Sequence, residues 1–249
     1  MARQRKAANQ SRQQALTKER EASVGDPIGS KSTEFVQKLQ SRVDAQGSSP
    51  SYDGHCNHFL REESLQDALE YSKDLSAPVS NPERALTDPQ FEKEQEHKHS
   101  QADANAQDAV RRIVNLESGN SKDRLRVNFM TCVEKFGRHQ TDSVLPPKPA
   151  ASPQPPADAR PEKTPRVGPD TGSPEVQVAI LTSKILNLAR HLKTTRTDKH
   201  NKRNLRLLVH KRQKMLQYLR KKERGGPRFQ HVMESLGLSD AAWKGEISF

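Results

Sequence analysis

Hydrophobic residues recur with helical spacing in the last third of the chain. The first stripe advances in steps of three and four residues, as on one face of an amphipathic helix: Val178, Leu181, Ile185, Leu188 and Leu192. Before it, Thr171-Gly172 forms a turn, Ser173 suits the N-cap and Pro174 suits the first helical position. We therefore predict a helix that starts after Ser173 and ends before a polar connection at 193–200.

Two further apolar stripes follow this helix. The second lies on a helix predicted from about Asn201 to Arg224, which Gly225-Gly226-Pro227 ends; its inner face carries Leu205, Leu208, Val209, Arg212, Met215, Leu216 and Leu219. The third is short, with Gly237 as the C′ cap and Leu238 folding back. Two long helices with a short connection make an antiparallel hairpin, and the third helix packs at one end. The predicted fold class is all-α.

The patterns upstream are weaker. Short helical patterns at 33–43 and 61–75 are too short to be stable alone in water. Between 103 and 136 apolar residues become periodic again, which predicts one helix before Gly119 and another that ends at Gly137. The next stretch has nine prolines and predicts an extended spacer: Pro146, Pro147, Pro149, Pro153, Pro155, Pro156, Pro161, Pro165 and Pro169.

Composition limits how much of the chain folds by itself. Only 31% of residues are hydrophobic and 4% aromatic, and the mean hydropathy is −0.97, so the apolar surface cannot offset the entropy of ordering the full length. We therefore expect a long, weakly ordered N-terminal extension. The predicted divisions are an extension at 1–100, a separate helical segment at 101–140, a proline-rich linker at 141–170, a helical domain at 171–239 and a tail at 240–249. No apolar run is long enough to cross a membrane.

Residues 1–20 are basic and poor in acids, which is typical of an organellar transit segment and equally of a basic disordered tail. His55-Cys56-Asn57-His58, with His97 and His99 further on, lacks the spacing of a metal site, so a solvated loop is favoured. Cys132 falls on an apolar face, which predicts packing rather than reactivity. Two cysteines form no disulfide framework and fit a reducing compartment.

Charge is concentrated at the C-terminal end. Residues 171–249 contain 17 Lys and Arg against 6 Asp and Glu, whereas residues 1–170 contain 25 of each sign. On the second long helix the basic residues have one acidic neighbour, Glu223: Lys202, Arg203, Arg206, Lys211, Lys214, Arg220, Lys221, Lys222 and Arg224. A solvated face normally mixes both signs, so a face of one sign predicts binding to phosphates. Nucleic acid is the first candidate partner and an anionic membrane surface the second.

Several motifs resemble the bacterial-type small-subunit ribosomal protein fifteen family: TGSPEVQVAILTSKI at 171–185, LARHL at 188–192, DKHN at 198–201, MLQYL at 215–219 and ESLGL at 234–238. VEKFGR at 133–138 is similar to the first helix of that family, which makes 139–170 an insertion. The resemblance implies a structural protein without enzymatic activity or cofactor. Its implied partner is small-subunit rRNA at a three-way junction in the platform, with neighbouring small-subunit proteins and large-subunit rRNA at an intersubunit bridge beside it. The elaborated extension implies a mitochondrial ribosome, with cytoplasmic and plastid ribosomes as alternatives, and no self-association or membrane contact is expected.

The resemblance also implies two groups of RNA-binding residues. Thr171, Gly172, Gln177 and Tyr218 would contact the junction, and Lys221 replaces an Arg there, which keeps the charge but loses the bidentate fork. His191, Asp198 and Asn201 would read a minor groove, where Asn201 replaces a Ser and Thr195 a second His. Lys202-Arg203 keeps the family's charge beside them.

Other interpretations of these residues stay open. Asp198 is alternatively the N-cap of the second long helix, Tyr218 is alternatively a core-edge residue, and Gln177 has no evident structural contact. An RNA-binding assembly factor or a DNA-binding helical module is the alternative function. An enzyme is not predicted, because His191 and Asp198 have no nucleophile, phosphate-binding Gly-rich loop or metal cluster beside them.

Overall fold

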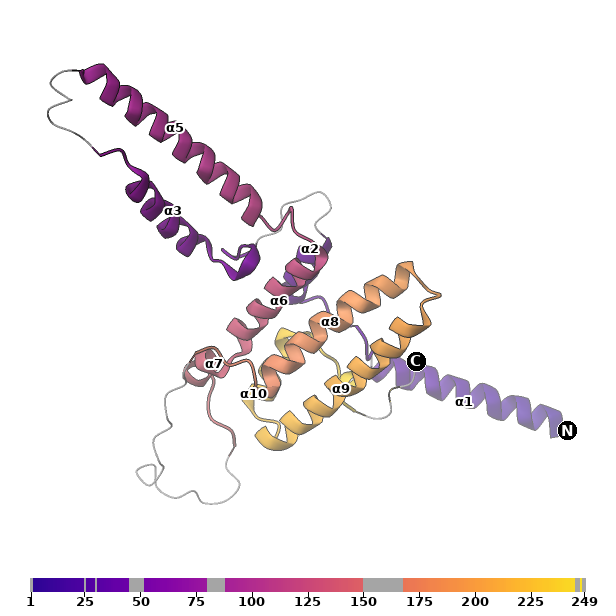
Figure 1. Ribbon diagram of the computed structural model, residues 1–249. Helices are drawn as coiled ribbons and strands as arrows, with labels where there is room; N and C mark the ends of the chain where they lie inside the picture. The colour runs from indigo at the N-terminus through magenta and orange to yellow at the C-terminus, as the bar shows by residue number, and fades with distance from the viewer. Residues whose placement is uncertain are drawn as a thin grey trace, which may run out of the picture. The chain divides into compact units, whose positions relative to one another are not determined.

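The computed structural model describes residues 2–24, 26–29, 31–44, 52–79, 88–149, 168–244 and 247. Within these residues every regular element is helical, apart from one isolated β-bridge between His55 and Arg61 (Figure 1). The predicted all-α class is confirmed. The chain divides into two compact units: unit 1 comprises residues 1–43 and 128–249, and unit 2 comprises residues 44–127.

The two long helices of unit 1 form the predicted hairpin. α8 (Pro174–Thr194) and α9 (Lys199–Glu223) run antiparallel side by side, and α10 (Pro227–Ser235) packs against both (Figure 1). The inner face of the hairpin is the predicted apolar stripe, with Ile185, Val209 and Leu216 fully buried. Helical periodicity therefore identified the packed faces correctly, because burial of one stripe is what stabilises an amphipathic helix.

The end of α10 matches the predicted cap. Gly237 has a positive φ of 60°, the N–H of Leu238 donates to the carbonyl of Met233 at 2.9 Å, and the N–H of Gly237 donates to that of Glu234 at 3.1 Å. These paired bonds define a Schellman motif, which turns the chain back so that Leu238 reaches the core. A short 3₁₀ helix follows at Asp240–Ala242, so the range predicted as a tail is packed up to Trp243.

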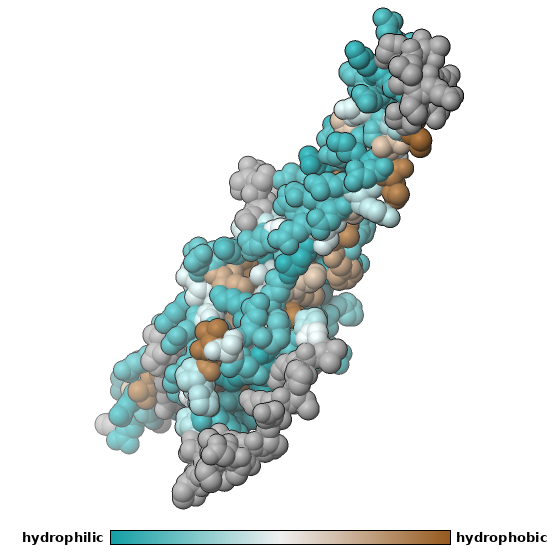
Figure 2. Space-filling view, turned by 90° about the vertical axis from the view of Figure 1, so that its left-hand side faces the viewer, coloured by the Kyte–Doolittle hydropathy of each residue, from teal (hydrophilic) through white to brown (hydrophobic). Residues whose placement is uncertain are grey.

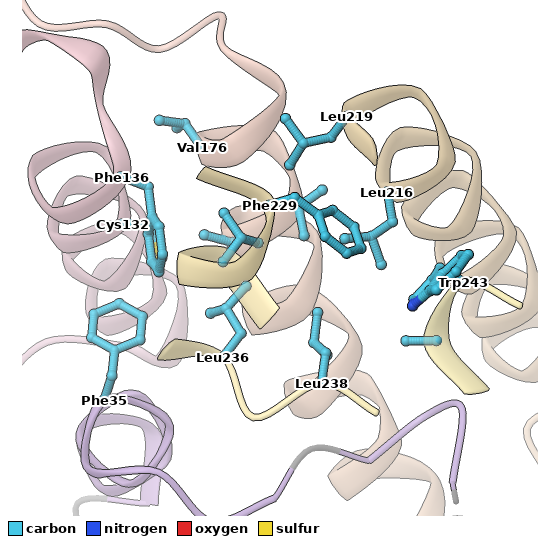
Figure 3. Packing of buried hydrophobic residues seen from close by; sticks show 14 of the residues in the cluster. Phe35, Cys132, Phe136, Val176, Leu216, Leu219, Phe229, Leu236, Leu238 and Trp243 are labelled. Carbon is cyan, nitrogen blue, oxygen red and sulfur yellow. The ribbon is translucent and has the colours of Figure 1, made fainter. Parts of the chain in front are cut away.

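The core of unit 1 draws on residues outside the predicted domain at 171–239 (Figure 3). Phe35 comes from α2 (Glu34–Asp44) and Phe136 from α6 (Ser121–Phe136), and their rings meet edge to face at 5.5 Å between centroids. Cys132 is fully buried beside them, as predicted, and burial raises its pKa to about 12. A hairpin of two helices leaves one side of its apolar surface open, and these upstream helices cover it.

Hydrogen bonds tie Pro27, Lys31 and Thr33 to α9 and to the C-terminal end of α10. The N–H of Lys31 donates to the carbonyl of Gly237 at 2.7 Å, and the hydroxyl of Thr33 donates to the carbonyl of Ser235 at 2.9 Å. The fully buried Arg212 donates to the carbonyl of Pro27. Part of the range 1–100, predicted as a weakly ordered extension, is therefore structurally integral to unit 1.

Unit 1 contains two further helices. α1 (Ala2–Val24) contains the candidate transit segment, and its side chains from 4 to 19 are all exposed. α7 (Arg138–Val144) extends into the range predicted as linker. Most of the proline-rich stretch, including Pro153 to Pro165, lies outside the described residues.

Unit 2 contains α3 (Glu62–Ser76), a short 3₁₀ helix (Asn57–Phe59) and α5 (Pro89–Val114). α5 begins well before the periodic stretch from which a helix was predicted, because Asp88 caps it and Pro89 occupies its first position. The loop at 55–58 was predicted as solvated, yet His55 and Asn57 are buried. The backbone bonds across it, such as Cys56 N–H to Leu60 carbonyl at 2.9 Å, fold it into a compact turn.

Candidate nucleic-acid interface

The exposed surface of α9 carries the basic residues that the sequence placed there. All nine of them are exposed: Lys202, Arg203, Arg206, Lys211, Lys214, Arg220, Lys221, Lys222 and Arg224. Their one acidic neighbour on the helix, Glu223, is buried and points away from them, with its Oε1 3.5 Å from Nη2 of Arg138. The face therefore presents positive charge alone, which suits a polyanion. Figure 2 shows the left-hand side of the view in Figure 1, and hydrophilic side chains predominate on the surface seen there.

A buried ion cluster fixes the end of the hairpin at which α8 begins and α9 ends. Nη2 of Arg138, from the start of α7, lies 3.0 Å from Oε1 of Glu175 on α8 and 3.5 Å from Oε1 of Glu223 on α9. The side chain of Glu175 is only 4% exposed. Three helices are thereby locked together beneath the turn at 171–173. No signal in the sequence pairs Arg138 with these distant acids.

The turn before α8 is shaped by Asp170. Its Oδ1 accepts the N–H groups of Gly172 and Ser173, both at 3.2 Å, and its Oδ2 accepts the N–H of Arg138 at 3.1 Å. Partial burial opposes ionisation of Asp170, but these hydrogen bonds outweigh it and hold its pKa below the ordinary value. Ser173 occupies the predicted N-cap position, but its side chain makes no capping hydrogen bond.

Thr171 and Gly172 are exposed at the tip of this turn. A Cβ added to Gly172 would meet no atom within 4 Å, so packing does not require a glycine there. Nε2 of Gln177 donates to the carbonyl of Gly172 at 3.1 Å. Gln177 thus has a structural contact that the sequence did not reveal, and it braces the turn from the first turns of α8.

Tyr218 and Lys221 lie near the C-terminal end of α9, at the same end of the antiparallel hairpin as the 171–173 turn. The side chain of Tyr218 points outward and is 52% exposed, while its neighbour Leu219 is fully buried. The core-edge interpretation of Tyr218 is therefore excluded. Lys222 lies over its ring with Nζ 5.6 Å from the centroid, and Lys221 is exposed.

The elbow between α8 and α9 holds the second predicted group. Oδ2 of Asp198 contacts Nε2 of His191 at 3.2 Å and accepts from Nδ2 of Asn201 at 2.6 Å, while its Oδ1 accepts the N–H of Asn201 at 3.0 Å. Asp198 therefore caps α9 and orients His191 at the same time. The hydrogen bond from the backbone of Asn201, followed by that from His191, keeps the pKa of Asp198 below its ordinary value. Lys202 and Arg203 lie exposed in the first turn of α9 beside this group.

The structure thus gathers the predicted residues into two groups rather than one. Thr171, Gly172, Gln177, Tyr218 and Lys221 form the turn group; His191, Asp198, Asn201, Lys202 and Arg203 form the elbow group. From Pro174 to His191 the rise of α8 separates them by roughly 25 Å, since each helical residue adds about 1.5 Å. A ligand that contacts both groups must therefore extend along the hairpin.

Other kinds of site are not apparent among the described residues. No three or more His, Cys, Asp or Glu side chains come together there as a metal site would require. None of the helices in that part of the chain is both long and apolar enough to span a bilayer.

Comparison with known proteins agrees with the geometry. The family model described as ribosomal protein S15 matches residues 159–239. The small ribosomal subunit protein uS15m of Neurospora crassa is 40% identical over 268 residues, which cover 99% of this chain and 82% of the relative. The protein of the same name from Schizosaccharomyces pombe is 29% identical over 265 residues, which cover 96% of this chain and 82% of the relative. The chain belongs to the ribosomal protein S15 family.

Proposed function

We propose that the protein is a structural, non-enzymatic constituent of the mitochondrial small ribosomal subunit. It binds small-subunit rRNA at a three-way junction in the platform, supports assembly of the subunit and contributes to a bridge with large-subunit rRNA. The names of the relatives, both small ribosomal subunit proteins uS15m, support the ribosomal and mitochondrial assignments. Neighbouring small-subunit proteins are its other partners.

One observation supports RNA binding most strongly. The exposed basic residues of α9 lie between two groups of polar residues at opposite ends of one hairpin. The one acid among them on that helix, Glu223, turns inward to Arg138 and does not neutralise them. The charged face would neutralise phosphates, which supplies affinity without sequence preference. The polar groups at the two ends would supply recognition, since they are spaced to meet two separate parts of a folded RNA.

The turn group suits close contact with a junction. Gly172 leaves open space where a side chain would stand, so an RNA backbone can approach the peptide closely. Thr171 offers a hydroxyl beside it, and Tyr218 offers an exposed ring on which a base or sugar can pack.

The elbow group suits a minor groove. RNA presents a wide, shallow minor groove with 2′-hydroxyls and base edges, which short polar side chains reach. Asp198 holds the imidazole of His191 and the amide of Asn201 in place before RNA binds. Each side chain can therefore contact the groove through its polar atoms that do not bond Asp198, and little further conformational entropy is lost on binding. Lys202 and Arg203 would contact the flanking phosphates.

The test compares binding of the full-length protein to a three-way junction RNA and to duplex DNA at about 150 mM salt. We expect the junction RNA to bind more tightly by at least about tenfold. Gly172→Ala should weaken RNA binding by about 1–2 kcal/mol, because its methyl group occupies the space through which the RNA backbone would approach. His191→Ala should weaken binding by about the same amount, because it removes a local contact. Helical circular dichroism and the thermal midpoint should stay unchanged in both variants, since Gly172 and His191 are both exposed. Equal affinity for duplex DNA would refute the proposal.

A ribosome assembly factor is the alternative. It would leave the finished subunit, whereas a structural constituent stays in stoichiometric amount. Sedimentation of mitochondrial small subunits in high salt separates these two outcomes: loss of the protein from mature particles would favour the assembly factor.

A further inference from the structure

A surface hollow lies at the C-terminal end of α9, where the segment after α10 packs against that helix. Its volume is about 380 Å³, and its lining is Gln217, Arg220, Lys221, Arg224, Gly225 and Trp243. We refer to it as the tryptophan hollow. Trp243 lies beyond residue 239, where the match to the family model ends, so the hollow includes a wall that the family motifs do not supply.

The charge of the tryptophan hollow is positive. Arg220, Lys221 and Arg224 are all exposed, and none of them has a carboxylate oxygen within 4.0 Å among the residues that the structure describes. The carboxylate of Asp240 forms its ion pair with Lys244, and the charge of Arg220 acts on it only from a longer distance. Nη1 of Arg224 donates to the carbonyl of Pro149 at 3.2 Å, which holds that side chain at the rim. The lining thus has three cationic side chains, and none of them forms an ion pair with a described acid.

Trp243 holds one of these cations in a defined orientation. The guanidinium carbon of Arg220 lies 4.1 Å from the ring centroid, within the range of a cation–π contact. The ring itself is fixed: Trp243 is 8% exposed, meets Phe229 edge to face at 5.9 Å, and its carbonyl accepts Nε2 of Gln217 at 3.0 Å. Figure 3 shows Trp243 at the edge of the core beside α9. Because the guanidinium of Arg220 is already held in place, the side chain loses less conformational freedom when a ligand binds. This favours an anion whose oxygens can accept two N–H groups of the guanidinium at once.

We propose that the tryptophan hollow binds a phosphodiester group of the RNA backbone. Arg220 and Arg224 donate to the phosphate oxygens, and Lys221 adds a point charge. The tryptophan hollow lies about one helical turn beyond Tyr218 along α9, next to the turn group. An RNA strand that contacts the turn group would therefore also pass over the hollow. This inference rests on the proposed RNA-binding function and adds Arg220, Arg224 and Trp243 to its contacts.

The chain provides its own probe, because Trp243 is its one tryptophan. The full-length protein is titrated with the three-way junction RNA while tryptophan emission is recorded. We expect emission to change as the RNA saturates, since the phosphate replaces water at the stacked guanidinium. Arg220→Gln should weaken binding by about 3- to 10-fold and reduce the slope of log affinity against log salt by about 0.7–0.9, the loss of one phosphate contact.

Three controls make the result decisive. Lys38→Gln removes one exposed charge on α2 and should leave both the emission change and the salt slope unaltered. Arg220→Lys keeps the charge and should keep the salt slope, while the affinity falls with loss of the fork. Inorganic phosphate at the same phosphate concentration as the RNA should leave the emission unchanged, because a single free anion lacks the neighbouring contacts.

The outcomes separate this inference from the proposed function. If the RNA binds and His191→Ala weakens it, but emission is unchanged and Arg220→Gln keeps the wild-type slope, the tryptophan hollow is not a contact site. An equal response to inorganic phosphate would reduce it to a general anion site and overturn the assignment to RNA. If wild-type protein does not bind the junction RNA, both the proposed function and this inference fail.

Discussion

Units 1 and 2 are both helical, yet their charges are opposite. Residues 44–127 contain 16 Asp and Glu against 10 Lys and Arg, a net charge of −6, whereas the rest of the chain contains 32 basic and 15 acidic residues, a net charge of +17. Unit 2 also exposes large apolar side chains, including Tyr71 at 66% and Leu75 at 69%. An acidic surface repels phosphate. The contrast favours unit 1 as the part that would bind RNA under the proposed function, and a helical fold alone does not indicate which surface binds.

The largest expected effect tests which residues hold unit 1 together. Phe136→Ala should lower the free energy of unfolding by about 3–5 kcal/mol, because it empties a fully buried ring site next to Phe35. Tyr71→Ala in unit 2 is the matched control and should change it by no more than about 0.5 kcal/mol, since that ring is mostly exposed. Chemical denaturation followed by circular dichroism measures both. A loss below about 1 kcal/mol for Phe136→Ala would show that α6 is not part of this core.

A smaller effect separates folding from binding within unit 1. Asp198→Ala removes the N-cap of α9 and should destabilise the protein by about 0.5–2 kcal/mol, while RNA affinity also falls. Asp198→Asn keeps a good capping side chain and should restore most of the stability. It loses the carboxylate that holds His191, so its RNA affinity should stay low. If Asp198→Asn restores both properties, the residue acts as a cap alone.

The smallest expected effect is a dependence of stability on pH. Burial, assisted by the charge of Lys135, lowers the pKa of His231, whose ring lies 5.5 Å from that of Phe136. The folded pKa is below the unfolded value near 6.5, so stability is fully present above pH 6.5 and decreases as pH falls through the folded pKa. Thermal midpoints between about pH 5 and 8 should show this decrease, and His231→Gln should remove it. A midpoint that rises on acidification would contradict the assignment.

Local patterns in the sequence predicted much of the hairpin. The steps of three and four residues from Val178 to Leu192 and the glycine at 237 depend on neighbours within one or two helical turns, and both predictions are confirmed. The absence of acids around the basic residues of α9 likewise predicted the charged face. The motifs at 171–177 and 191–201 identified candidate residues, whose contacts with RNA stay a prediction.

Contacts between distant segments escaped prediction. Phe35 and Phe136 are 101 positions apart, and nothing local distinguishes them from apolar residues on helices that face solvent. In the sequence, Glu223 is the one acidic neighbour of the basic residues on the second long helix. In the structure its carboxylate is buried and lies beside Arg138 instead. Trp243 lies in the range predicted as a tail. Tryptophan side chains are highly buried on average, so this residue was a sequence signal for packing in that range.

Helical periodicity and net charge are properties of short stretches, so the helical class, the basic C-terminal end and the hairpin follow from the order of the residues alone. Burial and charge pairing depend instead on distances in space, and residues far apart in the chain come together only when the chain folds. The fold therefore had to be known before one could say which upstream helices close the core, that the candidate residues divide between two ends of the hairpin, and that Arg220 stacks on Trp243.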